Sequence, residues 1–200
     1  MAVTSRRNRW ILSGGLASGK SQVRQMLAEA GLSTIDADQL GHSVLEPAGP
    51  AFADVAARWP QVVKRGRIDR AALASAVFED AGELAALESM THPHIFDTIR
   101  ARVEGVEGPV VVEIPVLNPR LNGEWRRMVV DSRDYVRLQR AMQRGMSEED
   151  ARSRMKLQPS RAEWLGSADL LIPNHGTEVE LRRTVTKLLE SAYLSSHPVA

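Results

Sequence analysis

Residues 12–22 read LSGGLASGKSQ. From Gly14 to Ser21 the segment fits the complete pattern G-x-x-x-x-G-K-[ST] of a phosphate-binding loop. Glycines permit the close approach and unusual φ angles that a loop needs when its N–H groups surround a polyphosphate. In such a loop the lysine, here Lys20, reaches the β- and γ-phosphates, and the hydroxyl of Ser21 binds Mg²⁺. A nucleoside triphosphate is therefore the first ligand to consider.

The flanking sequence supplies the structural context that this motif requires. Residues 9–13 form a short apolar run that predicts a strand, and residues 21–30 predict a helix that ends at Gly31. The positive end of that helix would point at the bound anion. A glycine-rich turn that binds nothing is the alternative, and the order of strand, loop and helix disfavours it.

The composition suits one globular domain with a sizeable core, because 43% of the 200 residues are hydrophobic. The formal net charge is only +1, so bulk charge favours neither nucleic-acid nor membrane binding, and we expect small-molecule partners. The absence of cysteine excludes disulfides and thiolate sites. The longest apolar run, residues 109–117, contains Glu113 and is far too short to span a bilayer.

The start of the chain imitates an export signal. A basic segment, residues 5–9, precedes three apolar residues, but Gly14 and Lys20 interrupt the apolar region almost at once. Removal of such a signal would also destroy the phosphate loop. We therefore expect a disordered or surface-lying basic arm and a cytoplasmic protein.

Strand and helix patterns alternate along the rest of the chain. Residues 32–35 predict a second strand, and residues 39–99 have a helical pattern that no convincing strand interrupts. Within that region the helices are expected at residues 51–59, 70–78 and 82–90. Further strands are expected at residues 110–114, 128–131 and 170–172, and further helices at 135–144, 147–157 and 178–193. The pattern predicts an α/β fold with a mostly parallel sheet and right-handed crossovers.

Two acidic positions at strand ends could carry chemistry. Glu113 could hold Mg²⁺ directly or through water, or it could be a structural carboxylate that is paired within the core. Asp36 and Asp38 lie two residues apart, so in an extended chain both would face one way. Asp38 could orient an acceptor hydroxyl as a base, or it could merely cap the following helix.

Arginine is enriched late in the chain, with seven arginines from Arg133 to Arg161. The arginines at 133, 137, 140 and 144 fall at helical spacing on one face, and Leu138, Ala141 and Met142 occupy another. Such a helix could simply be solvated. Arginine suits phosphate oxygens through its planar fork, so the sharper hypothesis is a lid that closes over the nucleotide.

In this order the motifs resemble the dephospho-coenzyme A kinase family over nearly the whole chain. The elements that carry the resemblance are Ser13–Ser21, Ile35–Asp38, Glu46–Pro47, Arg67–Arg70, Val77–Phe78, His92–Pro93, Pro115–Leu117, Leu138–Arg144, Ala168–Asp169, Ile172 and Asn174. The resemblance implies a three-layer P-loop kinase fold in which ATP and Mg²⁺ phosphorylate the ribose 3′-hydroxyl of dephospho-coenzyme A. The core would comprise residues 9–38, 100–134 and 165–194, with an acceptor-binding helical insertion at 39–99 and a lid at 135–164.

The resemblance also assigns roles to individual residues. Asp38 would be the base, and Lys20 and Arg140 would assist catalysis. The residues expected at ATP are Gly15, Ala17, Ser18, Gly19, Lys20, Ser21, Gln22, Arg140, Arg144 and Asn174, the last one near the adenine. The residues expected at the acceptor are Asp38, His42, Arg70 and His92, and those at Mg²⁺ are Ser21 and Glu113. His92 could equally be an ordinary helix-start or turn residue.

This chain also departs from the family pattern. Gly41-His42 stands where the family usually has Ala-Arg, so an expected cation is missing or is replaced by a titratable imidazole. Ala17 replaces a usual glycine, Gln22 a usual threonine and Arg137 a usual glutamine, and Pro115–Pro119 also differs. A kinase for another nucleoside or nucleotide therefore stays an alternative, as does a nucleotide-binding relative without activity.

Overall fold

The computed structural model describes residues 8–78, 80–114 and 125–191. The chain divides into two compact units, one from the described parts of Met1–Ile35 and Gly105–Ala200, the other from those of Asp36–Glu104. Each unit has its own core. The basic arm up to residue 7 and the element Pro115–Leu117, with the departure that extends to Pro119, lie outside the described residues.

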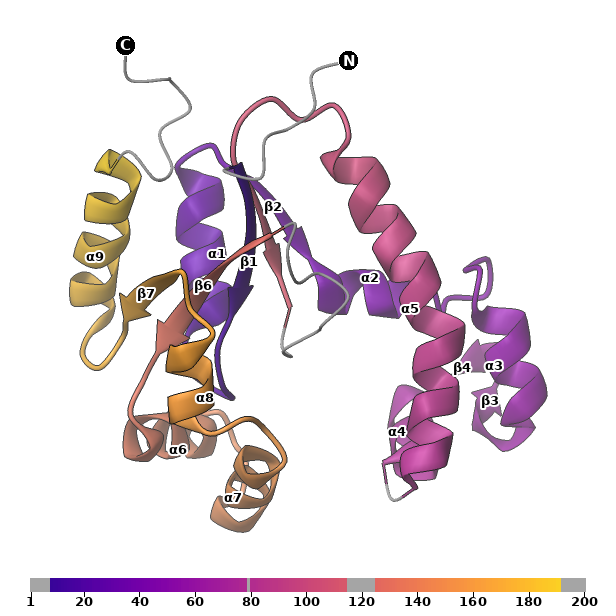
Figure 1. Cartoon of the computed structure of the whole chain (residues 1–200). Helices are drawn as coiled ribbons and strands as arrows, with labels where there is room; N and C mark the ends of the chain where they lie inside the picture. The colour runs from indigo at the N-terminus through magenta and orange to yellow at the C-terminus, as the bar shows by residue number, and fades with distance from the viewer. Residues whose placement is uncertain (1–7, 79, 115–124, 192–200) are drawn as a thin grey trace. The chain divides into compact units, whose positions relative to one another are not determined.

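A five-stranded sheet in the order β2-β5-β1-β6-β7 is the centre of the first unit (Figure 1). The strands are β1 Arg9–Ser13, β2 Ser33–Asp36, β5 Val110–Glu113, β6 Arg126–Asp131 and β7 Leu170–Pro173. β1 pairs in parallel with both β5 and β6, and β6 pairs in parallel with β7. The predicted parallel sheet is therefore confirmed, and the carboxyl ends of β1, β5, β6 and β7 share one edge.

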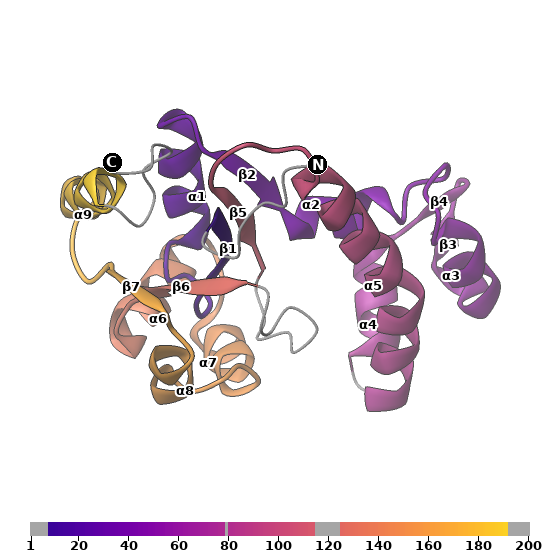
Figure 2. The same ribbon diagram turned by 45° about the horizontal axis from the view of Figure 1, so that its top comes forward.

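In the described residues of the first unit, five helices accompany this sheet. They are α1 Lys20–Glu29, α6 Asp134–Gln143, α7 Glu148–Lys156, α8 Arg161–Gly166 and α9 Glu178–Glu190. Figures 1 and 2 show α1 and α9 side by side against one face of the sheet. Alternate strand residues such as Trp10, Leu12 and Met128 are fully buried there against Leu27 and Leu181. This packing fixes the start of α1 relative to the carboxyl ends of the strands.

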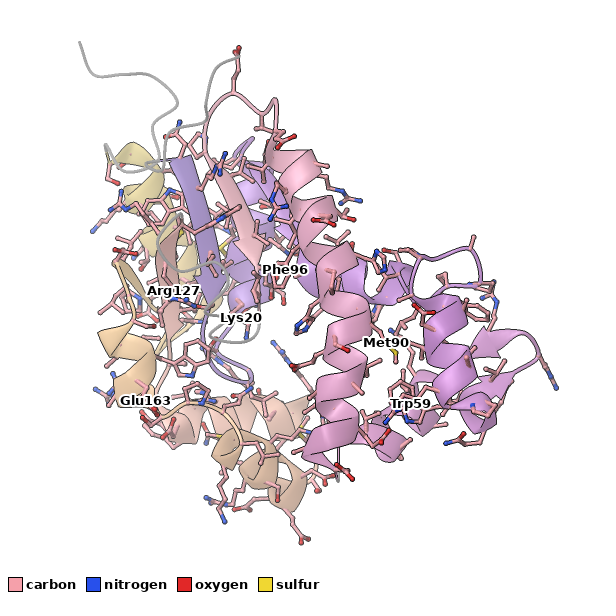
Figure 3. All side chains as sticks on the ribbon, turned by 45° about the vertical axis from the view of Figure 1, so that its right-hand side comes forward. Lys20, Trp59, Met90, Phe96, Arg127 and Glu163 are labelled. Carbon is pink, nitrogen blue, oxygen red and sulfur yellow. The ribbon has the colours of Figure 1, made fainter. Side chains whose placement is uncertain are left out.

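The second unit is mostly helical. Its elements are α2 Ala37–Ser43, α3 Phe52–Arg58, η2 Pro60–Val62, β3 Val63–Lys64, β4 Arg67–Ile68, α4 Arg70–Val77 and α5 Ala81–Val103. Its core gathers buried side chains from α3, η2 and α4, and Met90 of α5 packs against them near Trp59 (Figure 3). The indole nitrogen of Trp59 donates to Glu83, 2.8 Å away, which joins α3 to the first turn of α5.

The prediction that no strand interrupts residues 39–99 is wrong. β3 and β4 form a two-stranded antiparallel hairpin, and its turn residues Arg65 and Gly66 have φ angles of 50° and 75°. Two positive φ angles in a two-residue turn match the right-handed twist of the strands that they join. Strands of only two residues show no alternation, so the sequence pattern carried no signal for them.

The expected helix at 82–90 is also too short, because α5 continues to Val103 through Pro93. His92 is therefore a mid-helix residue, and its interpretation as a helix-start or turn residue is wrong. The hydroxyl of Thr91 donates to the carbonyl of Leu87 at 2.8 Å. A single proline does not end a long helix when the apolar side of that helix is buried.

One helix escaped the sequence argument altogether. α8 has a reciprocal capping box, in which the Ser160 side chain accepts from the Glu163 N–H and the Glu163 carboxylate accepts from the Ser160 N–H. The pattern Ser-x-x-Glu at residues 160–163 is the signal that could have found it. Apart from α2 and η2, for which no bounds were expected, the other described elements begin and end within a few residues of the expected positions.

Candidate active site

The phosphate-binding loop connects β1 to α1 and has the backbone geometry that its sequence predicts. Gly14 and Gly19 have φ angles of 142° and 102°, and Ala17 adopts a left-handed φ of 54°. A Cβ atom on Gly19 would lie 2.2 Å from the side-chain nitrogen of Asn174, so only glycine fits at this position. The strand, loop and helix follow in the expected order.

Lys20 and the start of α1 bring positive charge to the loop. Nζ of Lys20, labelled in Figure 3, donates to the carbonyl oxygens of Gly14 at 2.9 Å and Gly15 at 3.2 Å. α1 begins at Lys20 with no side-chain cap on its first N–H groups and no acidic residue in its first turn. Uncapped N–H groups and the helix dipole favour an anion at this end of the helix. The arrangement therefore fits a polyphosphate.

Ser21 and Glu113 lie together beside this loop. The Ser21 hydroxyl donates to Oε1 of Glu113 at 2.9 Å, and Nε of Arg24 donates to Oε2 of the same carboxylate at 2.7 Å. Glu113 ends β5 and is buried. A buried acid needs polar partners, and these two side chains supply them. The pairing with Arg24 matches the structural alternative, and the contact with Ser21 keeps the magnesium role open as a prediction.

A hydroxyl and a carboxylate oxygen fit the preference of Mg²⁺ for hard oxygen ligands. Among the described residues, no cluster of three or more His, Cys, Asp or Glu side chains could hold a metal ion by itself. A cation bound here would therefore need oxygen atoms from the nucleotide or from water in addition to the protein. This dependence is typical of phosphate-loop kinases.

Asn174 follows β7 and ties the loop to the neighbouring strand end. The residue is 2% exposed, and Nδ2 donates to the carbonyl of Ser18 at 2.7 Å. Its Oδ1 accepts from Nη2 of Arg140 at 3.2 Å, so both polar atoms of the amide contact the protein. The expected location near the adenine stays a prediction, and the support of the loop is a role that the sequence argument missed.

Arg140 projects from α6 towards the loop that connects β7 to α9. Its guanidinium donates to the Ser132 hydroxyl at 3.1 Å, the Asn174 carbonyl at 3.1 Å and the Gly176 carbonyl at 2.9 Å. Burial lowers the pKa of Arg140, and the charge of Arg144 lowers that pKa further. The roles of Arg140 and Arg144 at ATP stay predictions.

The prediction that four arginines share one face of a lid helix needs correction. Arg137 is 4% exposed and belongs to the buried side of α6, whereas Met142 is 43% exposed. Burial lowers the pKa of Arg137, and the nearby Asp134 carboxylate opposes this shift. Helical spacing alone could not predict which of these arginines is buried, because α6 carries arginines both towards the phosphate loop and towards solvent.

A second charged group lies at the end of β6, outside every expected site. Arg161 contacts Asp131 through two hydrogen bonds of 2.8 and 2.7 Å, and Nε2 of His175 lies 3.4 Å from the same carboxylate. The hydrogen bonds from Arg161 lower the pKa of Asp131. This group connects the strand end to α8 and to the loop after β7. The signal that could have found this group is Asp131, the acid at the end of the strand expected at residues 128–131.

The candidate acceptor residues belong to the second unit. Asp36 caps α2 by accepting from the N–H groups of Asp38 and Gln39, so the interpretation of Asp38 as the helix cap is wrong. Asp38 is in the first turn of α2 and is exposed, not in extended chain beside Asp36. His42 follows one turn later and is also exposed. The predicted base is thus a residue of the first turn and not the cap of α2.

The other two acceptor candidates lie on separate helices. Arg70 is the exposed first residue of α4, whose cap is Asp69. His92 lies on α5, and its ring packs edge-on against Phe96 with 5.7 Å between ring centroids. α2 packs on α5, and a Cβ atom on Gly41 would lie at an ordinary contact distance of 3.7 Å from Cδ1 of Ile95. The structure thus brings α2 and α5 together, and the acceptor roles of these side chains stay predictions.

The geometry of the loop agrees with a match to a known protein family. The family model described as dephospho-CoA kinase matches residues 10–180. The chain belongs to the dephospho-CoA kinase family. A curated dephospho-CoA kinase of Thermobifida fusca is 37% identical over 193 residues, which are 93% of this chain and 96% of the relative. The family resemblance inferred from the motifs is confirmed.

Solved structures agree with membership of the dephospho-CoA kinase family. The TT1252 protein of Thermus thermophilus has a TM-score of 0.80 at 30% identity, covering 90% of this chain and 95% of its own. A dephospho-CoA kinase from Campylobacter jejuni has a TM-score of 0.65 at 26% identity, covering 93% of this chain and 97% of its own. The predicted P-loop kinase fold is confirmed. None of the described helices combines the length and hydropathy needed to cross a membrane.

Proposed function

We propose that this protein transfers the γ-phosphoryl group of ATP to the ribose 3′-hydroxyl of dephospho-coenzyme A, giving coenzyme A and ADP. The observation that carries the proposal is the phosphate loop, with Lys20 over its carbonyls and Ser21 beside Glu113, in a chain that matches the family model over residues 10–180. The partners are therefore two small molecules, and we place the reaction in the cytoplasm.

In the proposed reaction the 3′-oxygen forms a bond to the γ-phosphorus while the bond from that phosphorus to the bridging oxygen of ADP breaks. Asp38 accepts the proton of the attacking hydroxyl. The exposure of its side chain and the capping of α2 by Asp36 support this role. His42, Arg70 and His92 contribute to acceptor binding. Catalysis then consists mainly of positioning and charge stabilisation.

The γ-phosphate is held by Lys20, and the growing negative charge on ADP is balanced by Arg140 and Arg144. The main-chain N–H groups of Gly15 and of residues 17–22 hold the remaining phosphates. Mg²⁺, when bound, neutralises phosphate charge. Ser21 and Glu113 would hold it, the acid directly or through water. The helices in residues 135–164 act as the lid that excludes water.

A coupled assay of ADP formation with and without dephospho-coenzyme A tests the proposal. The wild-type protein should consume ATP only when the acceptor is present. Asp38→Asn should retain ATP binding and lose turnover by about two to four orders of magnitude, the usual contribution of general acid–base catalysis. Wild-type turnover in that variant would remove Asp38 from the role of base.

Gly41-His42 departs from the family pattern, so the second experiment measures which acceptor the protein prefers. A panel of nucleosides and nucleotides should all react more slowly than dephospho-coenzyme A. Preference for another acceptor would replace the proposal with a different nucleoside or nucleotide kinase. ATP binding without transfer to any acceptor would indicate a binding module without activity.

A further inference from the structure

The back of the phosphate loop is held by two side chains that are distant in sequence. The N–H of Leu16 donates to Oε1 of Gln158 at 2.7 Å, and the carbonyl of Leu16 accepts from Nε of Arg137 at 2.9 Å. Nη2 of Arg137 donates to the same Oε1 at 3.0 Å. The three hydrogen bonds close a ring around Leu16, so both of its main-chain polar groups are engaged.

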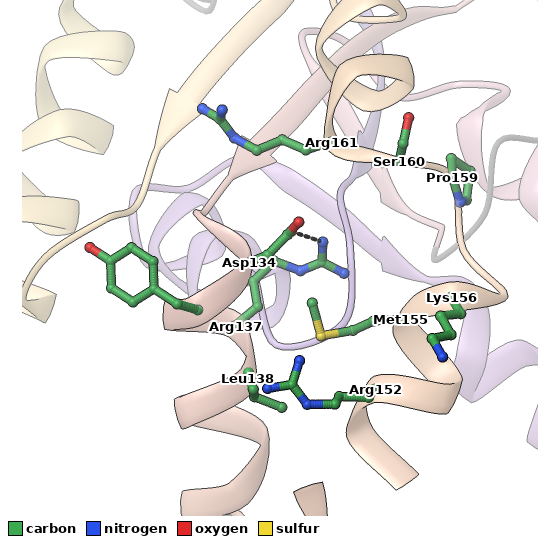
Figure 4. A pocket seen from close by; sticks show the side chains of 10 residues that line it. Asp134, Arg137, Leu138, Arg152, Met155, Lys156, Pro159, Ser160 and Arg161 are labelled. Atoms are coloured by element: carbon green, nitrogen blue, oxygen red, sulfur yellow. Dashed lines mark hydrogen bonds and ion pairs between the residues drawn. The ribbon is translucent and has the colours of Figure 1, made fainter. Parts of the chain in front are cut away.

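Arg137 is itself fixed in place. Its side chain is 5% exposed, and Nη1 donates to Oδ1 of Asp134 at 3.0 Å, the contact dashed in Figure 4. The guanidinium lies against Gly15, where a Cβ atom would come within 2.1 Å of Nη2. The group therefore fills a fitted space between α6 and the loop. Its donors point at the loop main chain and at neighbouring side chains.

The loop contains a feature that needs such support. Ala17 has a φ of 54°, a left-handed conformation that brings its Cβ close to the following carbonyl and that non-glycine residues rarely adopt. Ala17 is 8% exposed and packs with Ala141 of α6 and Ala151 of α7. Strained residues persist only where the surroundings over-determine them. The hydrogen bonds to Leu16, the preceding residue, supply that constraint.

We propose that Arg137 and Gln158 are positioning residues that hold the main chain at Leu16 and thereby keep Ala17 left-handed, so that the loop is preformed for the polyphosphate. The inference rests on the proposed function only in that ATP binds this loop. Arg137 acts through the loop backbone rather than through its charge. Gln158 is uncharged and shares the same ring of hydrogen bonds, so its loss should have the same consequence.

The test is a double-mutant cycle on Mg·ATP binding, measured by calorimetry without acceptor. Arg137→Met and Gln158→Leu should each raise Kd about five- to tenfold, because the loop loses its preformed shape. In an Ala17→Gly background, the factor by which each change raises Kd should be about fivefold smaller, because glycine adopts positive φ without strain. Arg182→Met on α9, which removes two exposed ion pairs, is the matched control and should leave Kd unchanged.

Equal losses with and without the Ala17→Gly change would overturn the inference, because they would show that the ring and the strained residue are independent. A loss in Arg137→Met but none in Gln158→Leu would also overturn it, since charge alone would then explain the effect. If Arg137→Met does not fold, the Gln158→Leu cycle decides the question by itself. The readout needs no acceptor, so failure to phosphorylate dephospho-coenzyme A would refute the proposed function and leave this result intact.

Discussion

Replacement of Asn174 by alanine removes the side-chain link between the loop after β7 and the Ser18 carbonyl. The change deletes the 2.7 Å hydrogen bond from Nδ2 to Ser18 and the 3.2 Å hydrogen bond that Oδ1 accepts from Arg140. Asn174 is 2% exposed, so both hydrogen bonds lie in the protein interior. A carbonyl of the phosphate loop would then lose its donor.

The magnitude follows from the cost of a buried polar group without a partner, about 1–3 kcal/mol. A loss of about 2 kcal/mol should lower Tm by about 4–8 °C in a chain of this size. If about 1.4 kcal/mol of that reaches the loop conformation that binds nucleotide, Kd for ATP rises about tenfold. The loss should be the same for ATP and GTP, because the amide acts on the loop and not on the base.

Calorimetric titration with ATP and GTP, together with thermal unfolding, measures both effects. Asn174→Asp is the matched variant, because it retains an oxygen for Arg140 but places a carboxylate oxygen against the Ser18 carbonyl. It should bind ATP at least as weakly as Asn174→Ala. Near-wild-type binding by Asn174→Asp would show that only the Arg140 contact matters. A changed ratio of ATP to GTP affinity would refute the reasoning and favour contact with the adenine.

Three further changes test other parts of the account. Gly19→Ala should weaken ATP binding at least tenfold, because the added Cβ would lie 2.2 Å from an asparagine amide and φ is 102°. Gly31→Ala is its control, since φ is 87° with nothing within 4 Å of the Cβ, and it should cost only about 1–2 kcal/mol of stability in thermal melts. Glu113→Gln removes a buried charge that faces an arginine, so the free energy of unfolding should fall by about 1–3 kcal/mol and activity should require more Mg²⁺. An unchanged magnesium titration would show that the acid does not hold the metal. The lowered pKa of Asp131 means that its pairing with Arg161 stabilises the fold above the ordinary carboxyl pKa and is lost as pH falls through the folded value. Asp131→Asn should therefore lower Tm near neutral pH, and the difference from wild type should shrink as the pH falls through the lowered pKa of Asp131.

The sequence predicted what depends on local pattern. The glycine spacing from Gly14 to Ser21 fixes a loop whose backbone has few alternatives, and the apolar run at residues 110–114 can only be satisfied in a buried strand. The parallel sheet and the start of α1 follow from these features. Family membership follows from the order of the motifs, which local physics alone does not give.

The sequence could not predict interactions between distant residues. Asn174 and Ser18 are 156 residues apart, and nothing in either neighbourhood signals that the amide will donate to the loop. Arg137 shows the same limit, because an arginine at helical spacing indicates solvent until tertiary packing supplies buried acceptors. The β3–β4 hairpin is too short to show a period. The continuation of α5 through Pro93 depends on packing that overrides a local breaker.

The most direct test of the central claim is identification of the reaction product. The wild-type protein, ATP, Mg²⁺ and dephospho-coenzyme A should yield one coenzyme A per ADP, with phosphorus NMR placing the new phosphate on the ribose 3′-oxygen. In a timed assay, Lys20→Met and Asp38→Asn should both reduce this signal by at least about two orders of magnitude while the variants stay folded. ADP formation without acceptor, or a phosphate on any other oxygen, would contradict it.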